Sequence, residues 1–287
     1  MMTLEQLRIF VAVAEREHLT RAAEALNLTP SAVSSAIRVL EERYGIALFH
    51  RTGRRIELTE TGEAFLPEAK ATLARAGSAD LFLTEIGGLK RGTLTLAASQ
   101  TVAGYWLPPR LMHFRKTYPA IDIRLTGGNT DEAAEAVLDG RAELGFVEGE
   151  IDHPALVQRV VARDRVVIVA PSGHPLAGKP DIDADDLAAA RWVLREPGSG
   201  TRRALTAALP EEALDIALSL PSNEAVRSAV LVGQTLTAVS EFVVEDDLAA
   251  GRMARIAFEL PERAFRLLRH KERYRSRASL AFEAELA

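Results

Sequence analysis

A group of small hydroxyl residues opens a helical segment near the N-terminus, and residues of this type could contact the bases of a DNA groove. Ser31, Ser34 and Ser35 follow Thr29 and Pro30. Thr29 is suited to cap a helix, and Pro30 suits its first position, where the missing N–H costs nothing. Short side chains in the first turn allow a helix to approach base edges closely. The segment therefore predicts the second helix of a helix-turn-helix.

Arginine side chains near these hydroxyls could contact phosphates. Arg38 lies on the same polar helical face, and two short alternating runs around Gly53 indicate a β-hairpin, or wing. Arginines on a wing suit backbone phosphates or a minor groove. The candidate DNA contacts are Thr20, Thr29, Ser31, Ser34, Ser35, Arg38, Arg51, Arg54 and Arg55. The alternatives are that the hydroxyls are simple caps, that Arg38 pairs with Glu41 or Glu42, and that the wing arginines are solvated charge.

A second set of polar residues follows predicted strands in the C-terminal two-thirds of the chain. Residues 99–101 lie at an expected helix start, and residues 198–201 precede another helix. Hydroxyls and free N–H groups at helix starts can hold an anion such as a small carboxylate, phosphate or sulfur oxyanion. The candidates are Ser99, Gln100, Thr101, Asn129, Thr130, Glu148, Ser199, Gly200, Thr201, Arg202 and Asn223. The alternative is that these segments are ordinary capping turns.

The elements that position the hydroxyl group are short helices. Apolar spacing predicts a helix over residues 3–16, and Thr20 is expected to cap the next one. After a break at 27–29, Val33, Ile37 and Leu40 form the buried stripe of the helix that begins at Pro30. Gly45 is expected to end that helix in a left-handed conformation.

A long helix is predicted from about residue 59, with Thr59 or Thr61 as its cap. Its apolar residues recur at threes and fours over about 28 residues, or roughly 40 Å. These residues are Phe65, Ala69, Leu73, Ala76, Ala79, Leu83 and Ile86. One long apolar stripe on a lone helix needs a partner, and the expected partner is the same helix of a second subunit. Glycines at 87, 88 and 92 mark a hinge.

From residue 93 the pattern changes to alternating strands and helices. Strands are predicted at 93–98, 121–125, 143–147, 157–169, 192–194, 236–239, 256–259 and 265–269, and helices at 107–117, 131–139, 201–209, 223–232, 243–250 and 276–285. This order predicts α/β architecture with mostly parallel sheets, in which ligands bind at the carboxyl ends of strands. Two repeats of the pattern indicate two lobes with a cleft between them.

Composition excludes several classes of protein. The 287 residues are 47% hydrophobic and contain no cysteine, which excludes a disulfide framework and a thiolate metal site. The net charge is −5, but residues 1–58 carry +1, which allows a local basic face. The start of the chain lacks the pattern of a signal peptide, and no long apolar stretch predicts a membrane span. A cytoplasmic location is therefore expected.

Enzyme signatures are lacking in the sequence. The segment GSGTR does not complete a phosphate-binding loop, no nucleophile elbow occurs, and the six histidines show no metal-like spacing. No catalytic residue, cofactor or metal is expected. Two alternatives remain: a solute-binding protein, which would need a secretion signal in place of residues 1–60, and an α/β enzyme fused to a DNA-binding module, which would turn over a bound ligand.

The whole chain resembles a LysR-type transcriptional regulator. The likeness is strongest over residues 4–66, where LRIFVAVAEREHLTRAAEALNLTPSAVSSAIRVLEERYGIALFHRT precedes LTETGEAF. The segments LTLAASQTVAGYWLPPRL, LREPGSGTR and LPSNEAVRSAV resemble the branch that controls carbon-fixation and sulfur-assimilation genes. Pro30, Ser35 and Ala36 depart from the longer polar residues common in the family, so base recognition is expected to depend on Ser31, Ser34, Arg38 and the wing.

The resemblance implies an α + α/β fold in three parts. These are a winged helix-turn-helix (1–58), a dimerising linker helix with a hinge (59–91), and a two-lobed domain like periplasmic binding proteins (92–287). Lobe 1 is expected at about 92–163 and 267–287 and lobe 2 at 164–266, with the chain crossing near 163–164 and 264–266. The implied partners are double-stranded promoter DNA, a small effector that alters DNA bending, and further copies of the chain in a dimer or tetramer. Contact with RNA polymerase is compatible with this role.

Overall fold

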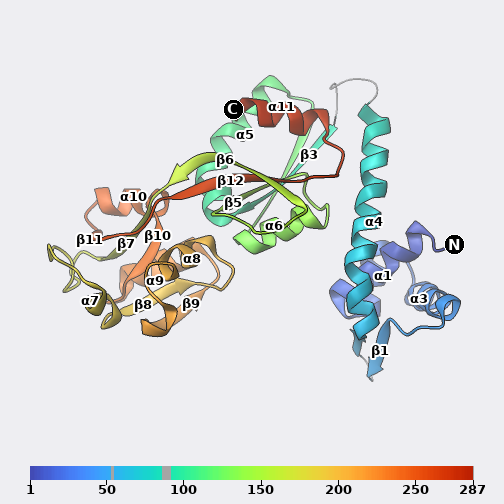
Figure 1. Cartoon of the computed structure of the whole chain (residues 1–287), viewed down its shortest axis with the longest axis horizontal. Coiled ribbons are helices and arrows are strands. Elements are labelled where there is room, and N and C mark those ends of the chain that lie inside the picture. The colour runs from blue at the N-terminus through green and yellow to red at the C-terminus, as the bar shows by residue number, and fades with distance from the viewer. Residues whose placement is uncertain (53–54, 86–91, 287) are drawn as a thin grey trace. The chain divides into compact units, whose positions relative to one another are not determined.

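The computed structural model describes residues 1–52, 55–85 and 92–286, without the side chains at 51, 52, 55, 81, 84 and 85. The chain divides into two compact units, unit 1 spanning Met1–Ile86 and unit 2 spanning Gly87–Ala287 (Figure 1). Within the described residues, no helix has the length and apolar character needed to cross a membrane.

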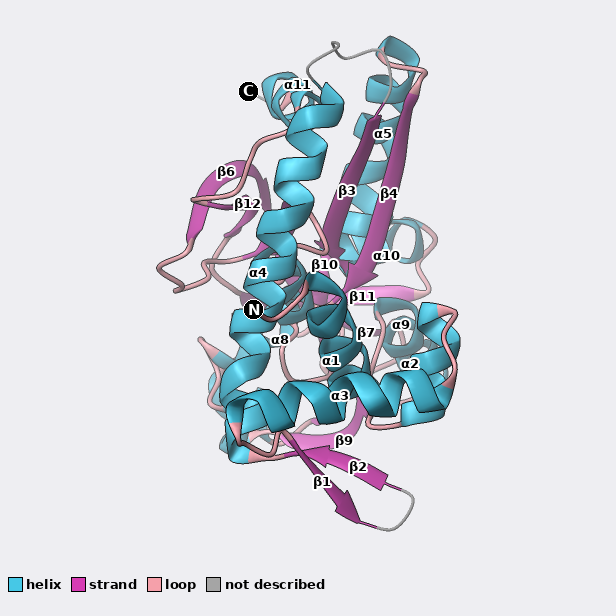
Figure 2. Ribbon diagram, turned by 90° about the vertical axis from the view of Figure 1, so that its right-hand side faces the viewer, coloured by secondary structure: helices cyan, strands magenta, loops and turns pink. Residues whose placement is uncertain are grey.

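Unit 1 is a helical domain with a small hairpin (Figure 2). Its helices are α1 (Leu4–Arg16), α2 (Leu19–Leu26), α3 (Pro30–Tyr44) and the long α4 (Glu60–Glu85). Strands β1 (Phe49–Thr52) and β2 (Arg55–Leu58) pair antiparallel and form the predicted wing. The helix-turn-helix is α2 followed by α3.

Local capping explains where these helices begin and end. Thr29 caps α3 by accepting a hydrogen bond from the Ala32 N–H at 3.2 Å, Pro30 occupies the first turn, and Gly45 follows at φ 65°, all as predicted. The predicted cap of α2 was wrong. His18 takes that position because its ring Nδ1 accepts from the Arg21 N–H, which places Thr20 inside the helix.

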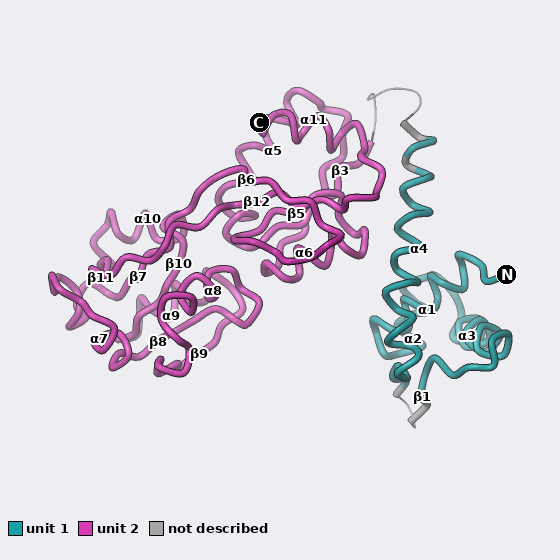
Figure 3. Tube along the Cα trace, in the orientation of Figure 1, with its two compact units in different colours: residues 1–86 teal, residues 87–287 magenta. Residues whose placement is uncertain are grey.

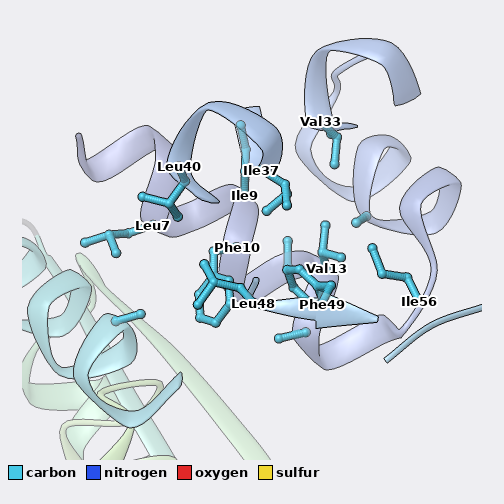
Figure 4. Packing of buried hydrophobic residues seen from close by; sticks show 14 of the residues in the cluster. Leu7, Ile9, Phe10, Val13, Val33, Ile37, Leu40, Leu48, Phe49 and Ile56 are labelled. Carbon is cyan, nitrogen blue, oxygen red and sulfur yellow. The ribbon is translucent and has the colours of Figure 1, made fainter. Parts of the chain in front are cut away.

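One hydrophobic core holds unit 1 together (Figure 4). Phe10 of α1 lies at its centre, with its ring centroid 5.4 Å from that of Phe49 and 5.0 Å from that of Phe65. The first half of α4 packs on this core through Phe65, Leu66, Ala69 and Leu73. Thr59 caps α4 by accepting from the Gly62 N–H at 3.0 Å. Helix α4 is therefore continuous with the core of the helix-turn-helix.

The first sheet of unit 2 defines lobe 1. Its five strands lie in the order β4 (Ile121–Gly128), β3 (Gly92–Ser99), β5 (Leu144–Glu148), β12 (Arg263–His270) and β6 (Leu156–Asp164). One hydrophobic cluster joins β3, β5 and β12 to three helical segments, which are a π-helical segment (Val102–Trp106), α5 (Leu107–Thr117) and α11 (Arg277–Glu285). A separate cluster packs α6 (Thr130–Leu138) against the sheet.

Lobe 2 contains two smaller sheets. The first has the order β10 (Thr237–Ser240), β7 (Val166–Pro171), β11 (Met253–Glu259), and the second pairs β8 (Arg191–Arg195) with β9 (Asp215–Leu220). The helices are α7 (Ala184–Ala188), α8 (Gly200–Thr206), the 3₁₀ turn Glu211–Ala213, α9 (Asn223–Val232) and α10 (Glu241–Ala249). Both lobes belong to unit 2, which Figure 3 colours separately from unit 1.

The structure corrects three expectations for unit 2. The predicted strand at 157–169 is two strands, because the chain leaves β6 at Asp164 and enters the sheet of lobe 2 at Val166. The second crossing lies between Glu259 and Arg263, a few residues earlier than expected. The sheets are not mostly parallel: β4, β3 and β5 run parallel, whereas β12 runs antiparallel to β5 and β6 because it enters from the other lobe.

Candidate functional site

Helix α3 presents a polar face opposite its buried stripe. Val33, Ile37 and Leu40 are buried against α1 and the wing, so the turns between them face outward. The outward residues Ser31, Ser35 and Arg38 are exposed, and Ser34 is half-buried. The Ser31 and Thr29 hydroxyls lie 3.0 Å apart at the start of the helix. This face is narrow and lined by short side chains, as entry into a major groove requires.

Arg38 is the basic side chain on this face of α3. Its Nε lies 3.8 Å from the Glu42 carboxylate, and both side chains are 65% exposed. Such a pair contributes little in water, because solvent screens both charges. Arg38 can therefore exchange Glu42 for a phosphate. Of the predicted wing arginines, Arg54 and the side chains of Arg51 and Arg55 lie outside the described residues.

The second candidate site lies between the two lobes of unit 2. Gln100 reaches across with both ends of its amide: its Nε2 donates to the Pro221 carbonyl at 2.7 Å, and its Oε1 accepts from the Asn223 N–H at 3.0 Å. Asn223 Nδ2 also donates to the Thr101 hydroxyl at 3.2 Å. The helix start after β3 is thus bonded to the start of α9.

A buried carboxylate occupies the centre of this site. Glu148, at the end of β5, accepts a hydrogen bond from the Thr130 hydroxyl at 2.8 Å, and its other oxygen lies 3.7 Å from Arg263 Nη2. Burial alone would raise the pKa of Glu148. The charge of Arg263 and the nearby hydroxyls of Thr130, Ser99 and Thr101 outweigh burial, so the pKa is held below its usual value. Glu148 is therefore ionised near neutral pH.

Arg263 connects Glu148 to the hinge and to lobe 2. Its Nε donates to Asp164 at 2.7 Å, and its Nη1 donates to the Thr201 hydroxyl at 3.1 Å. Asp164 also accepts from the Ser240 hydroxyl at 2.7 Å. Burial raises the pKa of Asp164, and the opposing charge of Arg263 does not fully offset it. One guanidinium is thus shared by two buried carboxylates.

Close approach of the lobes requires a glycine at position 200. A Cβ atom there would lie 2.7 Å from the Thr130 hydroxyl and 2.8 Å from Glu148 Cβ. Arg203 adds an ion pair across the lobes, with its Nη1 2.7 Å from an Asp131 oxygen. The two lobes are in direct contact at these points, so the site is closed in this structure.

The structure brings most of the predicted effector residues together. Ser99, Thr101, Thr130, Glu148, Ser199, Thr201 and Asn223 are all buried near this closure. Asn129 caps α6 through the Glu132 N–H at 2.9 Å. Arg202 is the exception, because it bonds to Glu211, Ser219 and the Arg195 carbonyl, all within lobe 2.

Sequence reasoning missed three charged members of this site. Arg263 and Asp164 face each other because β12 pairs with β6 in a register that places them opposite one another. Arg195 is also buried and donates to Asn223 Oδ1 at 2.6 Å and to Glu196 at 2.8 Å. No local signal marks these residues, since each is recruited by pairing between distant segments. The described residues contain no cluster of His, Cys, Asp or Glu that could hold a metal ion.

Comparison with family models agrees with this two-unit structure. Residues 4–63 match the bacterial regulatory helix-turn-helix protein family of lysR type, and residues 87–287 match the LysR substrate binding domain. The chain therefore belongs to the LysR family of transcriptional regulators. This confirms the resemblance and the fold class predicted from the sequence, and the matching families are regulators rather than enzymes.

Curated relatives cover nearly the whole chain. It is 35% identical over 286 residues to the uncharacterized HTH-type transcriptional regulator YeiE of Escherichia coli K12, covering 98% of this chain and 95% of that protein. It is 34% identical over 254 residues to a RuBisCO operon transcriptional regulator of Acidithiobacillus ferrooxidans, covering 88% and 82%. The second relative agrees with the predicted likeness to regulators of carbon fixation.

Solved structures share the fold. Full-length CbnR, solved in complex with its target DNA, matches with a TM-score of 0.65 at 24% identity, covering 99% of both chains. The CcmR regulatory domain of Synechocystis PCC6803, solved in complex with 2-PG, matches with a TM-score of 0.63 at 26% identity and covers 68% of this chain and 96% of that one.

Proposed function

We propose that this LysR-type regulator binds promoter DNA through α3 and the wing, and that a small anion bound between the lobes of unit 2 alters that binding. The observation that carries the effector site is the set of buried polar side chains contributed by both lobes, which includes Thr130, Thr201 and Asn223. Buried polar groups are costly unless they are bonded, so a ligand that bonds them can shift the lobes.

The DNA-binding role is supported by the exposed polar face of α3. Six residues are proposed to contact bases and phosphates: Ser31, Ser34, Ser35 and Arg38 of α3, its cap Thr29, and Thr20 of α2. Arg51, Arg54 and Arg55 stay predictions from the sequence as phosphate contacts on the wing. Replacing Arg54 and Arg55 with Ala is expected to flatten the salt dependence of operator binding, and an unchanged slope would reject that role.

The effector role is supported by the closure of the lobes. Ser99, Gln100, Thr101, Asn129, Thr130, Glu148, Ser199, Gly200, Thr201 and Asn223 are the proposed ligand contacts, and Arg202 is proposed to support α8 rather than touch the ligand. A related domain, that of CcmR, was solved with 2-PG, which supports a small ligand here. Opening and closing would change how paired subunits lie and hence the spacing of their recognition helices.

Assembly through α4 is part of the proposal. The second half of this helix exposes Phe82 and Leu83, in the region where the sequence predicts a continuous apolar stripe. A second copy of α4 would cover them and pair two recognition helices, as a two-fold operator requires. A tetramer and contact with RNA polymerase in the cytoplasm are compatible with this assembly.

The experiment that tests the effector site combines an anion screen with one glycine substitution. Small carboxylates, phosphate esters and sulfur oxyanions are screened by thermal shift on the full chain, and each hit is tested for a changed footprint on the DNA next to the protein's own gene. Gly200→Ala is expected to reduce the ligand-dependent shift, because the added methyl group meets Thr130 and Glu148. Gly173→Ala, which meets no atom within 4 Å, is the matched control.

Two outcomes would contradict the proposal. An identical footprint with and without saturating anion would remove the effector from regulation. An undiminished thermal shift in Gly200→Ala would place the ligand away from the contact between the lobes.

A further inference from the structure

The charges enclosed between the lobes do not balance. Glu148 and Asp164 are each 4% exposed, and Arg263, which lies between them, is 7% exposed. The other buried arginine of the site, Arg195, is already engaged by Glu196 and Asn223. Two carboxylates therefore share one guanidinium, and an additional hydrogen-bond donor would be stabilised beside them.

Donors surround Glu148 without being fully used. The Ser99 hydroxyl is 1% exposed, lies near enough to Glu148 to lower its pKa, and makes no hydrogen bond of normal geometry to the described residues. Arg263 Nη2 is already paired with Asp164 at 2.6 Å and lies 3.7 Å from Glu148, beyond hydrogen-bond distance. The site therefore offers one spare donor, a guanidinium and a carboxylate acceptor in one place.

Such a mixture of groups discriminates between oxyanions. The Ser99 hydroxyl and the Arg263 guanidinium suit oxygen atoms that carry negative charge, whereas Glu148 repels any oxygen that cannot donate to it. An oxyanion that keeps a proton presents both kinds of oxygen, and its O–H can donate to Glu148 in a charge-assisted hydrogen bond. A fully deprotonated oxyanion of the same shape places like charges in contact.

We propose that Glu148 makes this site selective for oxyanions that carry a proton, and that it rejects those that carry none. This inference rests on the proposed function, because it specifies the ligand of the same site. When the lobes part to admit the ligand, Ser99 and Arg263 bond its charged oxygens, and Glu148 accepts a hydrogen bond from its proton-bearing oxygen. Glu148 is thus the residue that determines specificity within the anion class.

The test compares two pairs of tetrahedral anions on the full chain by calorimetry at mildly alkaline pH. Phosphate and arsenate keep a proton there, whereas sulfate and selenate do not, although all four are dianions. The first pair should bind at least about 10-fold more tightly, since a hydrogen bond to a charged group changes an equilibrium constant by that factor or more. Each pair contains a smaller and a larger anion, so the comparison separates the effect of the proton from the effect of the anion's radius.

Variants identify the residue responsible. Glu148→Gln should bring the affinities for the two classes of anion close together, because the neutral amide can donate as well as accept. Glu150→Gln is the matched control, since Glu150 is 70% exposed, pairs with Arg266 and takes no part in the site. A thermal unfolding profile that matches that of the wild-type protein in the absence of anion shows that each variant is folded. If Glu148→Gln does not fold, the affinities of the wild-type protein for the four anions decide the question alone.

The outcomes separate this inference from the proposed function. Equal binding of all four anions by the wild-type protein, or selectivity that survives Glu148→Gln, overturns the role of Glu148 and leaves an anion site in place. Binding of none of the four to either form, with operator binding intact, overturns this inference, and anion binding between the lobes is then rejected as well if the screen of small anions also finds no ligand.

Discussion

The role of Arg38 in operator binding can be tested by comparing substitutions of Arg38 and of Glu42, its ion-pair partner on α3. Replacing Arg38 with Ala should weaken operator binding and reduce the slope of log affinity against log salt by about 1, because one phosphate contact is lost. Replacing Glu42 with Gln should leave operator binding intact or strengthen it, since Arg38 is then free of its pair. Both are measured by binding to labelled operator over a series of salt concentrations. If Arg38 serves only to pair with Glu42, neither substitution will change the slope.

Asp247 is a charged residue in lobe 2 whose role is stability. Its side chain is fully buried and accepts hydrogen bonds from Arg227 and from Arg252. The Arg227 hydrogen bond lowers the pKa of Asp247, more than burial raises it, and Arg252 adds to the lowering. The stabilisation is therefore present above the pKa of the unfolded chain, about 3.9, and disappears as pH falls through the lower pKa of the folded state.

The expected cost of Asp247→Asn is about 1–3 kcal/mol near neutral pH, limited by the partial exposure of both arginines. Asp246→Asn, at an exposed position on the same helix, should cost no more than about 0.5 kcal/mol. Thermal unfolding of the two variants at neutral pH and below about pH 4 gives the comparison. A difference between them that stays constant as the pH falls would show that the charge of Asp247 is not the cause.

Two glycines of α4 show that one helix can be destabilised by an added side chain at one position and accept it at another. A Cβ on Gly62 would meet the Leu48 carbonyl oxygen and lie 2.8 Å from Leu58 Cδ2, whereas a Cβ on Gly77 meets nothing within 4 Å. Gly62→Ala should destabilise unit 1 by about 1–3 kcal/mol through overpacking. Gly77→Ala should stabilise it by up to about 1 kcal/mol, because alanine favours the helix.

Operator binding measured as a function of temperature reports the stability of unit 1 in both glycine variants, because binding depends on the folded helix-turn-helix. The temperature at which half of the operator binding is lost should fall for Gly62→Ala and rise or stay constant for Gly77→Ala. If both variants lower this temperature equally, the close contact between α4 and the wing is not what fixes this helix.

Elements whose limits are set locally were the ones that the sequence could predict. The start of α3 depends on Thr29 and Pro30, and its end on Gly45, so neighbouring residues suffice to define it. Strand β9 escaped prediction although Ile216, Leu218 and Leu220 alternate along it, because it is only 6 residues long and most of them are exposed. The break between β6 and β7 was also missed, because apolar residues recur through both strands and only the pairing of the strands in different sheets separates them.

The sequence also predicted one part of the candidate effector site and missed another. Thr101 and Thr130 come just after the ends of β3 and β4, and Thr201 lies in the first turn of α8, so position along the chain was enough to select them. The charges that govern its chemistry could not be found in this manner. Arg263 meets Asp164 across 99 residues of sequence, through the register of two strands that cross between the lobes.

At the scale of the whole molecule, the proposed function needs a pair of recognition helices, and α4 is the element proposed to supply it. The first half of α4 packs against the core of unit 1. In the second half, Phe82 is 50% exposed and Leu83 is 67% exposed. Apolar side chains at adjacent exposed positions are costly in water and favour a partner surface. The double substitution Phe82→Glu and Leu83→Glu should therefore weaken self-association by about 100-fold or more, because the lost burial and the added charges both oppose it.

Sedimentation of the full chain over a range of concentrations measures this change, and Ala71→Glu is the control, since it adds a charge at an exposed position off the predicted stripe. The double variant should also lose affinity for a two-fold operator more than for a single half-site, because each half-site needs only one recognition helix. Equal losses on both DNAs would mean that the substitution has damaged unit 1 itself. Unchanged self-association would mean that the chain pairs through another surface, and α4 would then act only as a spacer.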